Sequence, residues 1–357
     1  YEAFSLSGVT ARWLPQPAVT AKFDLTLHVF ELPDGMSGYC DFATDLFDAV
    51  TVERLLDHWK RVLAGMVREP QAALATLALM SESERDQVQR LWNQTTVDYP
   101  RDQCLHDWFA AQAKRTPDAI AVSCAGEDLT YRDLDERSTR LARHLREQGV
   151  KAEAVVGLCV PRSPDLLIGL LGILKAGGAY LPLDPGYPRQ RLQYMIRDSG
   201  AQRVLTHTSV RAALGDHGVP ETYIDAEAHI IARHSCEPIG RTAQPGNLAY
   251  LIYTSGSTGE PKGVMGIHGA AVNYFHAIRD AYGLSSSDVV LQLTSISFDA
   301  SIRDLVGPLL LGARLCLLST EEALSSEKIH GAIDEYRVNT ILSITPTLLR
   351  HLLEGAH

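Results

Sequence analysis

The sequence lacks the cysteine pairs that mark zinc sites and disulfide frameworks. It contains no Cys-x-x-Cys, and its six cysteines stand far apart. They are Cys40, Cys104, Cys124, Cys159, Cys236 and Cys316. This spacing predicts reduced, mostly buried thiols in a cytoplasmic protein, with no metal site built from them.

Long runs of one residue class are also missing. The formal net charge is −10 and no long Lys or Arg run occurs, which argues against a nucleic-acid partner. The longest apolar stretches, around residues 166–174 and 305–318, are broken by Gly, Pro or Arg, so we expect no membrane partner. No secretory signal opens the chain. An anionic ligand must therefore be held by local geometry rather than by a basic surface.

A length of 357 residues with 45% apolar residues predicts two domains. In residues 1–92, an alternating run at 25–29 predicts a strand, and a turn at 33–38 leads to a second strand at 39–42. Apolar spacing predicts a helix over 52–66, and a second helix begins at Ser81, where Glu84 completes a capping box. Residues 93–104 are mostly polar, contain a proline and have no period, so they predict an interdomain linker.

Residues 105–357 show alternating strand and helix signals. The predicted strands include 120–124, 155–160, 179–181, 248–253, 289–293, 314–318 and 340–344, with helices between them. The apolar helix that follows the strand at 155–160 is predicted to end at Gly177 and Gly178. This order predicts an α/β domain with mainly parallel sheets covered by helices. The chain opens on Tyr1 and its last residues follow a predicted helix start at Pro346, so we expect both ends to be cut from a longer protein.

The ten residues 254–263, TSGSTGEPKG, describe a loop that can hold phosphate oxygens. Gly256 and Gly259 permit backbone angles that a side chain would forbid, and Lys262 adds a positive charge. The hydroxyl donors are Thr254, Ser255, Ser257 and Thr258. The loop follows a predicted buried strand, which places it at the carboxyl end of that strand, where such sheets bind ligands. The pattern predicts a polyphosphate ligand.

The loop differs from the common P-loop, which needs Gly-Lys followed by Ser or Thr. Here Lys262 follows Pro261 and precedes Gly263, so no hydroxyl stands beside the lysine to hold magnesium in that way. Clusters of Gly, Ser and Thr also form ordinary turns, and Lys262 also fits a solvated loop lysine. The sequence alone leaves these alternatives open.

Four motifs in order make residues 98–357 similar to the adenylation domain of a nonribosomal peptide synthetase. They are LTYRDL from Leu129, LKAGGAYLPLDPGYP from Leu174, LAYLIYTSGSTGEPKG from Leu248 and FDAS from Phe298. Residues 1–92 resemble the end of a condensation domain, with FDLTL from Phe23 and YCDFATDLFDAVTVERLLDHW from Tyr39. The resemblance implies the N-terminal core of an adenylate-forming enzyme, truncated here, preceded by a partial α+β condensation lobe.

The resemblance implies a reaction in which an amino acid carboxylate attacks the α-phosphorus of ATP. The products are an aminoacyl-adenylate and pyrophosphate, and the acyl group then moves to phosphopantetheine on a carrier domain that this chain lacks. Mg²⁺ would neutralise the leaving pyrophosphate. The implied nucleotide contacts are Thr254, Ser255, Gly256, Ser257, Thr258, Gly259 and Lys262, with Thr258 and Lys262 acting in catalysis. The implied partners are the carrier domain and the remainder of the condensation domain.

By the same resemblance, Asp299 of the FDAS motif pairs with the α-ammonium of the substrate. A partly desolvated cation needs an anionic partner, which gives this role a chemical reason. The alternative is a helix N-cap, since Asp299 precedes a predicted helix. The neighbouring Phe298 belongs to the same implied substrate site.

Ala300, Arg303 and Ser343 would line the side-chain pocket. Arg303 departs from the apolar or aromatic residue often found there in relatives that activate hydrophobic amino acids. We therefore predict an acidic or strongly polar substrate, with a surface position for Arg303 as the alternative.

Two other classes of protein share some of these features. An acyl-CoA ligase would share the loop, although the condensation remnant and Asp299 count against it. A non-catalytic platform between domains is the second alternative. Because the family's later motifs are absent, we expect the isolated chain to be inactive or nearly so.

Overall fold

The computed structural model describes residues 20–255 and 261–354. The predicted loop residues Gly256, Ser257, Thr258 and Gly259 lie outside these ranges. The chain divides into two compact units, Tyr1–Val97 and Asp98–His357.

The first unit contains an antiparallel hairpin and a long helix. Strands β1 (Leu25–Leu32) and β2 (Gly35–Phe42) pair along their whole length, and α1 covers Ala49–Arg68. The short segments η1 (Leu74–Thr76), α2 (Glu82–Asp86) and η2 (Gln87–Leu91) follow. The hairpin and helix predictions are confirmed. An apolar groove of about 320 Å³ lies between the hairpin and α1, with Leu27, Val29 and Trp59 among its lining residues.

The predicted capping box is present at the start of α2. The Ser81 N–H donates to Glu84 Oε2 at 2.7 Å, and the Glu84 N–H donates to Ser81 Oγ at 3.1 Å. The backbone hydrogen bond from Ser81 lowers the pKa of the Glu84 carboxyl to about 2. The Ser-x-x-Glu pattern therefore identified the beginning of this helix from sequence.

The second unit contains two sheets. The first has six strands in the order β10-β9-β6-β5-β7-β8, all parallel except β10. Its strands are β5 (Val155–Cys159), β6 (Ala179–Pro182), β7 (Arg203–Thr206), β8 (Glu221–Tyr223), β9 (Leu248–Thr254) and β10 (Lys262–Ile267). The second sheet has the order β11-β12-β3-β4, with only β4 antiparallel. Its strands are β3 (Ile120–Cys124), β4 (Glu127–Thr130), β11 (Val289–Gln292) and β12 (Arg314–Leu317).

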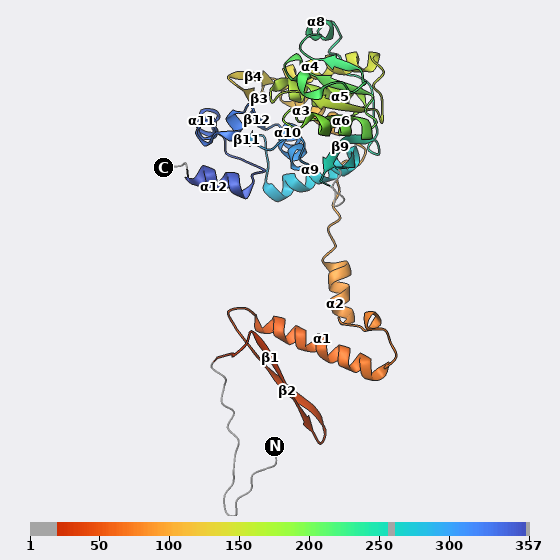
Figure 1. Ribbon diagram of the computed structural model, residues 1–357, viewed down its shortest axis with the longest axis vertical. Helices are drawn as coiled ribbons and strands as arrows, with labels where there is room; N and C mark the ends of the chain where they lie inside the picture. The colour runs from red at the N-terminus through yellow and green to blue at the C-terminus, as the bar shows by residue number, and fades with distance from the viewer. Residues whose placement is uncertain (1–19, 256–260, 355–357) are drawn as a thin grey trace, which may run out of the picture. The chain divides into compact units, whose positions relative to one another are not determined.

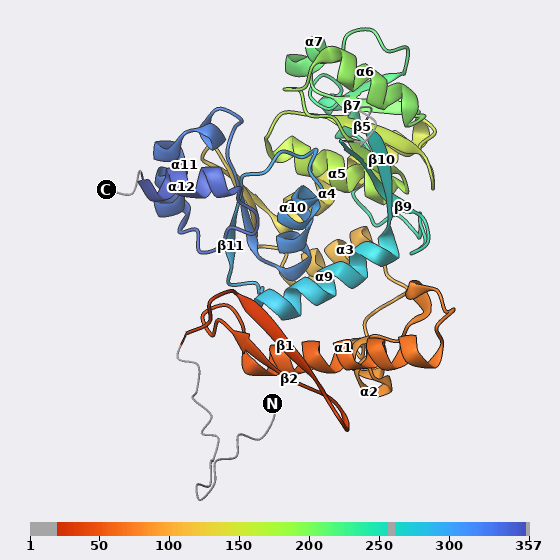
Figure 2. The same ribbon diagram turned by 60° about the horizontal axis from the view of Figure 1, so that its bottom comes forward.

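Helices form three layers around these two sheets (Figures 1 and 2). The middle layer, whose apolar residues share a core with both sheets, consists of α3 (Leu105–Arg115), α4 (Tyr131–Glu147), α5 (Pro164–Ala176), α9 (His268–Tyr282) and α10 (Ala300–Leu311). Helices α6 (Arg189–Asp198) and α7 (Arg211–Leu214) cover the outer face of the six-stranded sheet. Helices α11 (Ser326–Tyr336) and α12 (Pro346–Glu354) cover the outer face of the other sheet. Short segments η3 (Thr208–Val210), α8 (Ala228–Ile231) and η4 (Glu322–Leu324) complete the unit.

The α/β prediction with mainly parallel, helix-covered sheets is confirmed. The predicted end of α5 is also correct, because Gly177 caps that helix at φ 98°, a left-handed conformation that favours glycine. The described part of the chain contains no helix long and apolar enough to cross a membrane.

The predicted strand at 340–344 is wrong. Only Thr340 pairs with β11, through a single parallel bridge to Val290. Two residues later the Leu342 carbonyl accepts a hydrogen bond from the Arg303 side chain at 2.9 Å. The backbone therefore leaves the sheet to meet α10.

Candidate functional site

The ends of the predicted phosphate loop are fixed by a pair of antiparallel strands. Thr254, the last residue of β9, is the register partner of Lys262, the first residue of β10. Thr254, Ser255 and Lys262 are exposed. Strand β10 was missed from sequence, and with it the fact that the loop joins two paired strands.

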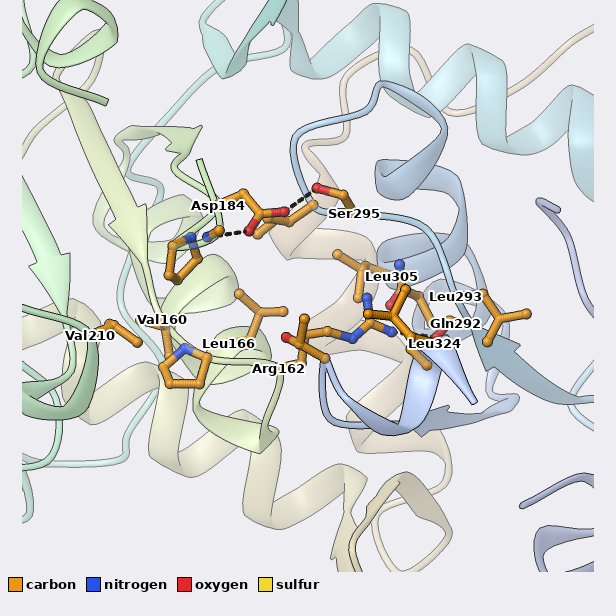
Figure 3. A pocket seen from close by; sticks show the side chains of 16 residues that line it. Val160, Arg162, Leu166, Asp184, Val210, Gln292, Leu293, Ser295, Leu305 and Leu324 are labelled. Atoms are coloured by element: carbon orange, nitrogen blue, oxygen red, sulfur yellow. Dashed lines mark hydrogen bonds between the residues drawn. The ribbon is translucent and has the colours of Figure 1, made fainter. Parts of the chain in front are cut away.

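A crevice lies where the carboxyl ends of both sheets meet (Figure 3). It has a volume of about 290 Å³, and its lining includes Arg162 after β5, Asp184 after β6 and Gln292 at the end of β11. The guanidinium of Arg162 donates to the carbonyl oxygens of Gln292, Thr294 and Leu318 at 2.5, 2.9 and 2.8 Å. Because these carbonyls lie at or just after the ends of β11 and β12, Arg162 links the two sheets. Burial lowers the pKa of Arg162.

Asp184 connects the same two sheets on the other side of the crevice. Its carboxylate accepts hydrogen bonds from the Ser295 hydroxyl and from the Gly186 N–H, the latter at 2.9 Å. Ser295 lies in the turn that leads to the FDAS motif, so this contact fixes the approach to α10.

A second, open pocket of about 450 Å³ contains three of the predicted substrate residues. Helix α10 contributes Asp299, Ala300 and Arg303, α9 contributes Tyr274, and β9 contributes Tyr250. We call this the α9–α10 pocket. Phe298 does not line it and is 60% exposed in the preceding turn.

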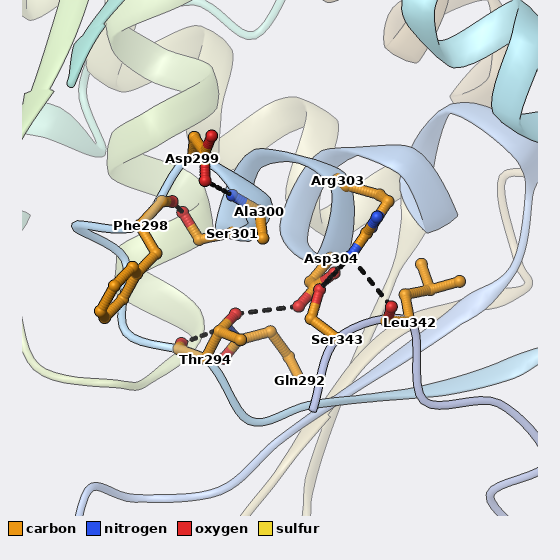
Figure 4. A network of polar contacts seen from close by, with 10 residues as sticks. All are labelled: Gln292, Thr294, Phe298, Asp299, Ala300, Ser301, Arg303, Asp304, Leu342 and Ser343. Carbon is orange, nitrogen blue, oxygen red and sulfur yellow. Dashed lines mark hydrogen bonds and ion pairs between the residues drawn. The ribbon is translucent and has the colours of Figure 1, made fainter. Parts of the chain in front are cut away.

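Asp299 is both an N-cap and a pocket residue. One carboxylate oxygen accepts from the Ala300 N–H at 2.8 Å, and Asp299 is exposed at the start of α10 (Figure 4). Within the described residues, its other oxygen makes no hydrogen bond or ion pair. The capping role and the proposed binding role are therefore compatible in geometry.

Arg303 is not a surface side chain; only 18% of it is exposed. Its Nη2 donates to the Leu342 carbonyl at 2.9 Å and to the Ser343 hydroxyl. Its Nε lies 3.4 Å from Oδ1 of the buried Asp304. The structure thus brings Arg303 and Ser343 together across 40 residues of sequence, while Nη1 has no bonded partner among the described residues.

Asp304 is a site residue that the sequence analysis missed. It is 1% exposed, and its carboxylate accepts from Ser343 Oγ at 2.6 Å and from Thr294 Oγ1 at 2.8 Å (Figure 4). These hydrogen bonds hold the Asp304 carboxylate in position, where it balances the positive charge of Arg303. The position of Asp304 next to Arg303 in the sequence is only a weak indication that the two pair, because neighbouring residues of a helix face different directions.

Tyr250 was also missed, since the run LAYLIY indicated only a buried strand. A Cβ at Gly266 would lie 2.1 Å from the Tyr250 ring, so glycine at 266 lets this ring lie across β10. Burial, followed by the charge of Asp299, raises the pKa of Tyr250. The tyrosine therefore stays protonated at neutral pH and presents a polar hydroxyl near Asp299.

The potential metal ligands of the described residues lie elsewhere. Ligand atoms of Cys104, His106 and Asp107 fall within 4.8 Å of one another at the start of α3. The Asp107 carboxylate accepts from the Cys104 N–H at 3.1 Å, and burial raises the pKa of the Cys104 thiol to about 12. We assign this group to capping α3.

Two buried histidines predict a loss of stability in acid. Burial lowers the pKa of His106 to about 4 and that of His268 to about 3. Because the unfolded chain binds protons below about pH 6.5 and the folded chain does not, unfolding free energy falls as pH drops from 6.5 toward 4. Each histidine contributes a slope of up to about 1.4 kcal/mol per pH unit. Urea unfolding at several pH values measures this slope.

His268→Asn is the matched variant for this prediction. The Leu105 N–H donates to His268 Nδ1 at 3.3 Å, and an asparagine oxygen can replace that acceptor without titrating. The variant should show a shallower slope between pH 6.5 and 4. An unchanged slope contradicts the assignment.

Two family models match this chain. The family model described as AMP-binding enzyme matches residues 109–357, and the condensation-domain model matches residues 2–89. The chain therefore belongs to the AMP-binding enzyme family. Its condensation domain followed by an AMP-binding domain makes it part of a nonribosomal peptide synthetase.

Two of the curated relatives are peptide synthases much longer than this chain. Gramicidin S synthase 2 of Brevibacillus brevis is 38% identical over 94% of this chain, which spans 7% of that relative. Tyrocidine synthase 3 of Brevibacillus parabrevis is 41% identical over 85% of this chain, which spans 5% of it.

Solved structures show the same fold. A nonribosomal peptide synthetase with alpha-methyl-L-serine-AMP bound has a TM-score of 0.80 and 30% identity, covering 95% of this chain and 38% of that one. A four-domain synthetase bound to AMP and glycine has a TM-score of 0.79 and 26% identity, covering 94% of this chain and 25% of that one.

Proposed function

We propose that the synthetase containing this chain activates an amino acid with MgATP. The α-carboxylate of the amino acid attacks the α-phosphorus, and the bond to pyrophosphate breaks. The aminoacyl group then passes to a phosphopantetheine thiol on a carrier domain. The observation that carries this proposal is Asp299, a carboxylate exposed at the mouth of the α9–α10 pocket.

In this reaction the described residues would bind and orient the nucleotide, and none of them would form a covalent bond to it. Thr254, Ser255 and Lys262, at the two ends of the loop, would contact the β- and γ-phosphates together with residues 256–259. The Lys262 ammonium would neutralise charge on the leaving pyrophosphate. Mg²⁺ would be held by the phosphate oxygens of the nucleotide, which are hard ligands that suit it.

Arg303 supports an acidic or strongly polar side chain in the substrate. Its guanidinium is held in place by Leu342 and Ser343, which leaves Nη1 for a ligand oxygen. A structural neighbour, VinN, was solved with 3-methylaspartate at a TM-score of 0.64 and 26% identity, covering 71% of this chain and 69% of that one. That neighbour, solved with an acidic amino acid, supports the proposal.

Arg303→Gln tests the substrate class. In the full-length synthetase, pyrophosphate exchange with aspartate or glutamate should exceed exchange with phenylalanine. The variant should lower kcat/KM for the acidic substrate about tenfold, which is the loss of one charge-assisted hydrogen bond. Arg279→Leu, on the exposed surface of α9, is the control and should change nothing. A wild-type preference for phenylalanine contradicts the acidic-substrate proposal.

An acyl-CoA ligase is the second candidate, since it would use the same loop. It predicts thioester formation on free coenzyme A and no need for Asp299, because a substrate without an α-amine leaves that carboxylate unpaired. A purely structural platform predicts no ATP-dependent rise in melting temperature.

The same proposal gives each part of the chain a role in the synthetase. Residues 1–92 would act with the remainder of a condensation domain, 93–104 would link the domains, and 105–357 would form the N-terminal portion of the adenylation domain. The apolar groove beside α1 supports a partner for the first unit. We expect the protein to act in the cytoplasm, where ATP is available.

A further inference from the structure

Helix α6 contacts residues near both ends of the phosphate loop. The Tyr194 hydroxyl donates to the carbonyl oxygen of Pro261, near the end of the loop, at 3.2 Å. The Tyr253 hydroxyl, just before the loop, donates to Asp198 Oδ2 at 2.6 Å. Tyr194 and Asp198 are one turn apart on α6 and therefore share a face. One helix face thus meets both ends of the loop.

Helix α6 is itself anchored by buried apolar side chains. Its Leu192, Met195 and Ile196 are at most 1% exposed and belong to the core on the outer face of the six-stranded sheet. Tyr253 is 5% exposed, and its ring meets the Tyr194 ring edge-on at a centroid distance of 6.3 Å. The two tyrosines therefore pack on each other as well as bonding to opposite ends of the loop.

A glycine allows the Tyr253 ring to lie against the second strand. Tyr253 is the register partner of Gly263, and a Cβ at Gly263 would lie 3.2 Å from the Tyr253 ring. A side chain at 263 would push against this ring. The glycine after Lys262 thus has a packing role in addition to any contact with ligand.

The contact at Pro261 sets the direction of the chain into Lys262. The proline ring fixes φ of residue 261, and the Tyr194 hydroxyl holds its carbonyl, which restricts ψ. The φ and ψ angles of Pro261, the residue before Lys262, are therefore both restricted. From the other side, Lys262 is paired with Thr254 in the sheet.

We propose that Tyr194 and Asp198 make α6 the positioning element for Lys262, holding both ends of the loop so that the ammonium meets the polyphosphate of MgATP. This inference rests on the proposed function. Burial, then the bond to Asp198, raises the pKa of Tyr253. The tyrosine therefore remains a hydrogen-bond donor at neutral pH.

Tyr194→Phe and Tyr253→Phe test this role in the full-length synthetase. Each variant keeps its ring and loses one hydrogen bond. Each should raise KM for MgATP about fivefold in amino-acid-dependent pyrophosphate exchange, and should leave KM for the amino acid within about twofold. Because the two variants alter opposite ends of the loop, a folding defect in one of them still leaves the other as a test.

Tyr223→Phe is the matched control. Tyr223 ends β8, the opposite edge strand of the same sheet, and its hydroxyl bonds to Glu221. This variant should leave KM for MgATP unchanged. An equal rise in both KM values for Tyr194→Phe indicates general loosening and overturns the inference, as does an unchanged KM for MgATP in both loop variants. Wild-type protein without amino-acid-dependent exchange overturns the proposed function itself, and this inference with it.

Discussion

Asp299→Asn in the full-length synthetase should lower kcat/KM for the amino acid in pyrophosphate exchange about 100-fold, as expected when one member of a partly desolvated ion pair is removed. The carboxylate that faces the α9–α10 pocket would otherwise pair with the substrate's α-ammonium. KM for MgATP should stay close to the wild-type value, because the phosphate loop lies on other elements.

The asparagine substitution separates the two roles of this residue. Asp299 caps α10 by accepting from the Ala300 N–H, and asparagine is an equally good N-cap. The variant should therefore fold normally. Asp280→Asn, an exposed change on α9, is the control for charge and should keep full activity. An Asp299→Asn enzyme with wild-type kcat/KM contradicts ammonium binding and leaves only the capping role.

Lys175→Met should lower the free energy of unfolding by about 3–5 kcal/mol, the usual cost of breaking a buried ion pair. The ammonium of Lys175 donates to Asp135 Oδ1 at 2.7 Å, to Ser138 Oγ at 2.8 Å and to Thr139 Oγ1 at 2.9 Å. These partners lie on α4, so one side chain on α5 fastens two neighbouring helices. Burial lowers the pKa of Lys175, but the Asp135 carboxylate and the other oxygen acceptors stabilise its charged form. The midpoint of urea unfolding measures the effect.

Lys114→Met is the control for this prediction. Lys114 is an exposed lysine on α3, close to the same buried cluster. Its replacement should change the unfolding free energy by less than about 0.5 kcal/mol. If both variants unfold at the same urea concentration as wild type, the Lys175 pair contributes nothing measurable and this account of the α4–α5 contact is wrong.

Much of the fold could be predicted because the relevant signals are local. The alternation in β1, the Ser81–Glu84 box and the glycine after α5 each depend on a few consecutive residues. The loop could be located because it follows β9, a strand with a run of buried residues. Strand β10 was missed because its residues are almost all exposed and give no alternating pattern.

The arrangement around Arg303 could not be predicted because its partners come from distant segments. Ser343 and Leu342 meet Arg303 only because the chain leaves the sheet after Thr340. The same departure makes the predicted strand at 340–344 wrong. The contacts of Tyr194 with Pro261 likewise join residues 67 positions apart and depend on how α6 packs. The sequence named Asp299, Ala300 and Arg303, and the fold shows that they line one pocket.

We propose above that this chain supplies the amino acid and MgATP contacts of an adenylation reaction. Pyrophosphate exchange by the full-length synthetase, compared for an amino acid and for the same acid without its α-amine, tests it most directly. We predict exchange with glutamate or aspartate, little or none with glutarate or succinate, and loss of that discrimination in Asp299→Asn. Equal exchange with the deaminated acids, or thioester formation on free coenzyme A, would contradict the account.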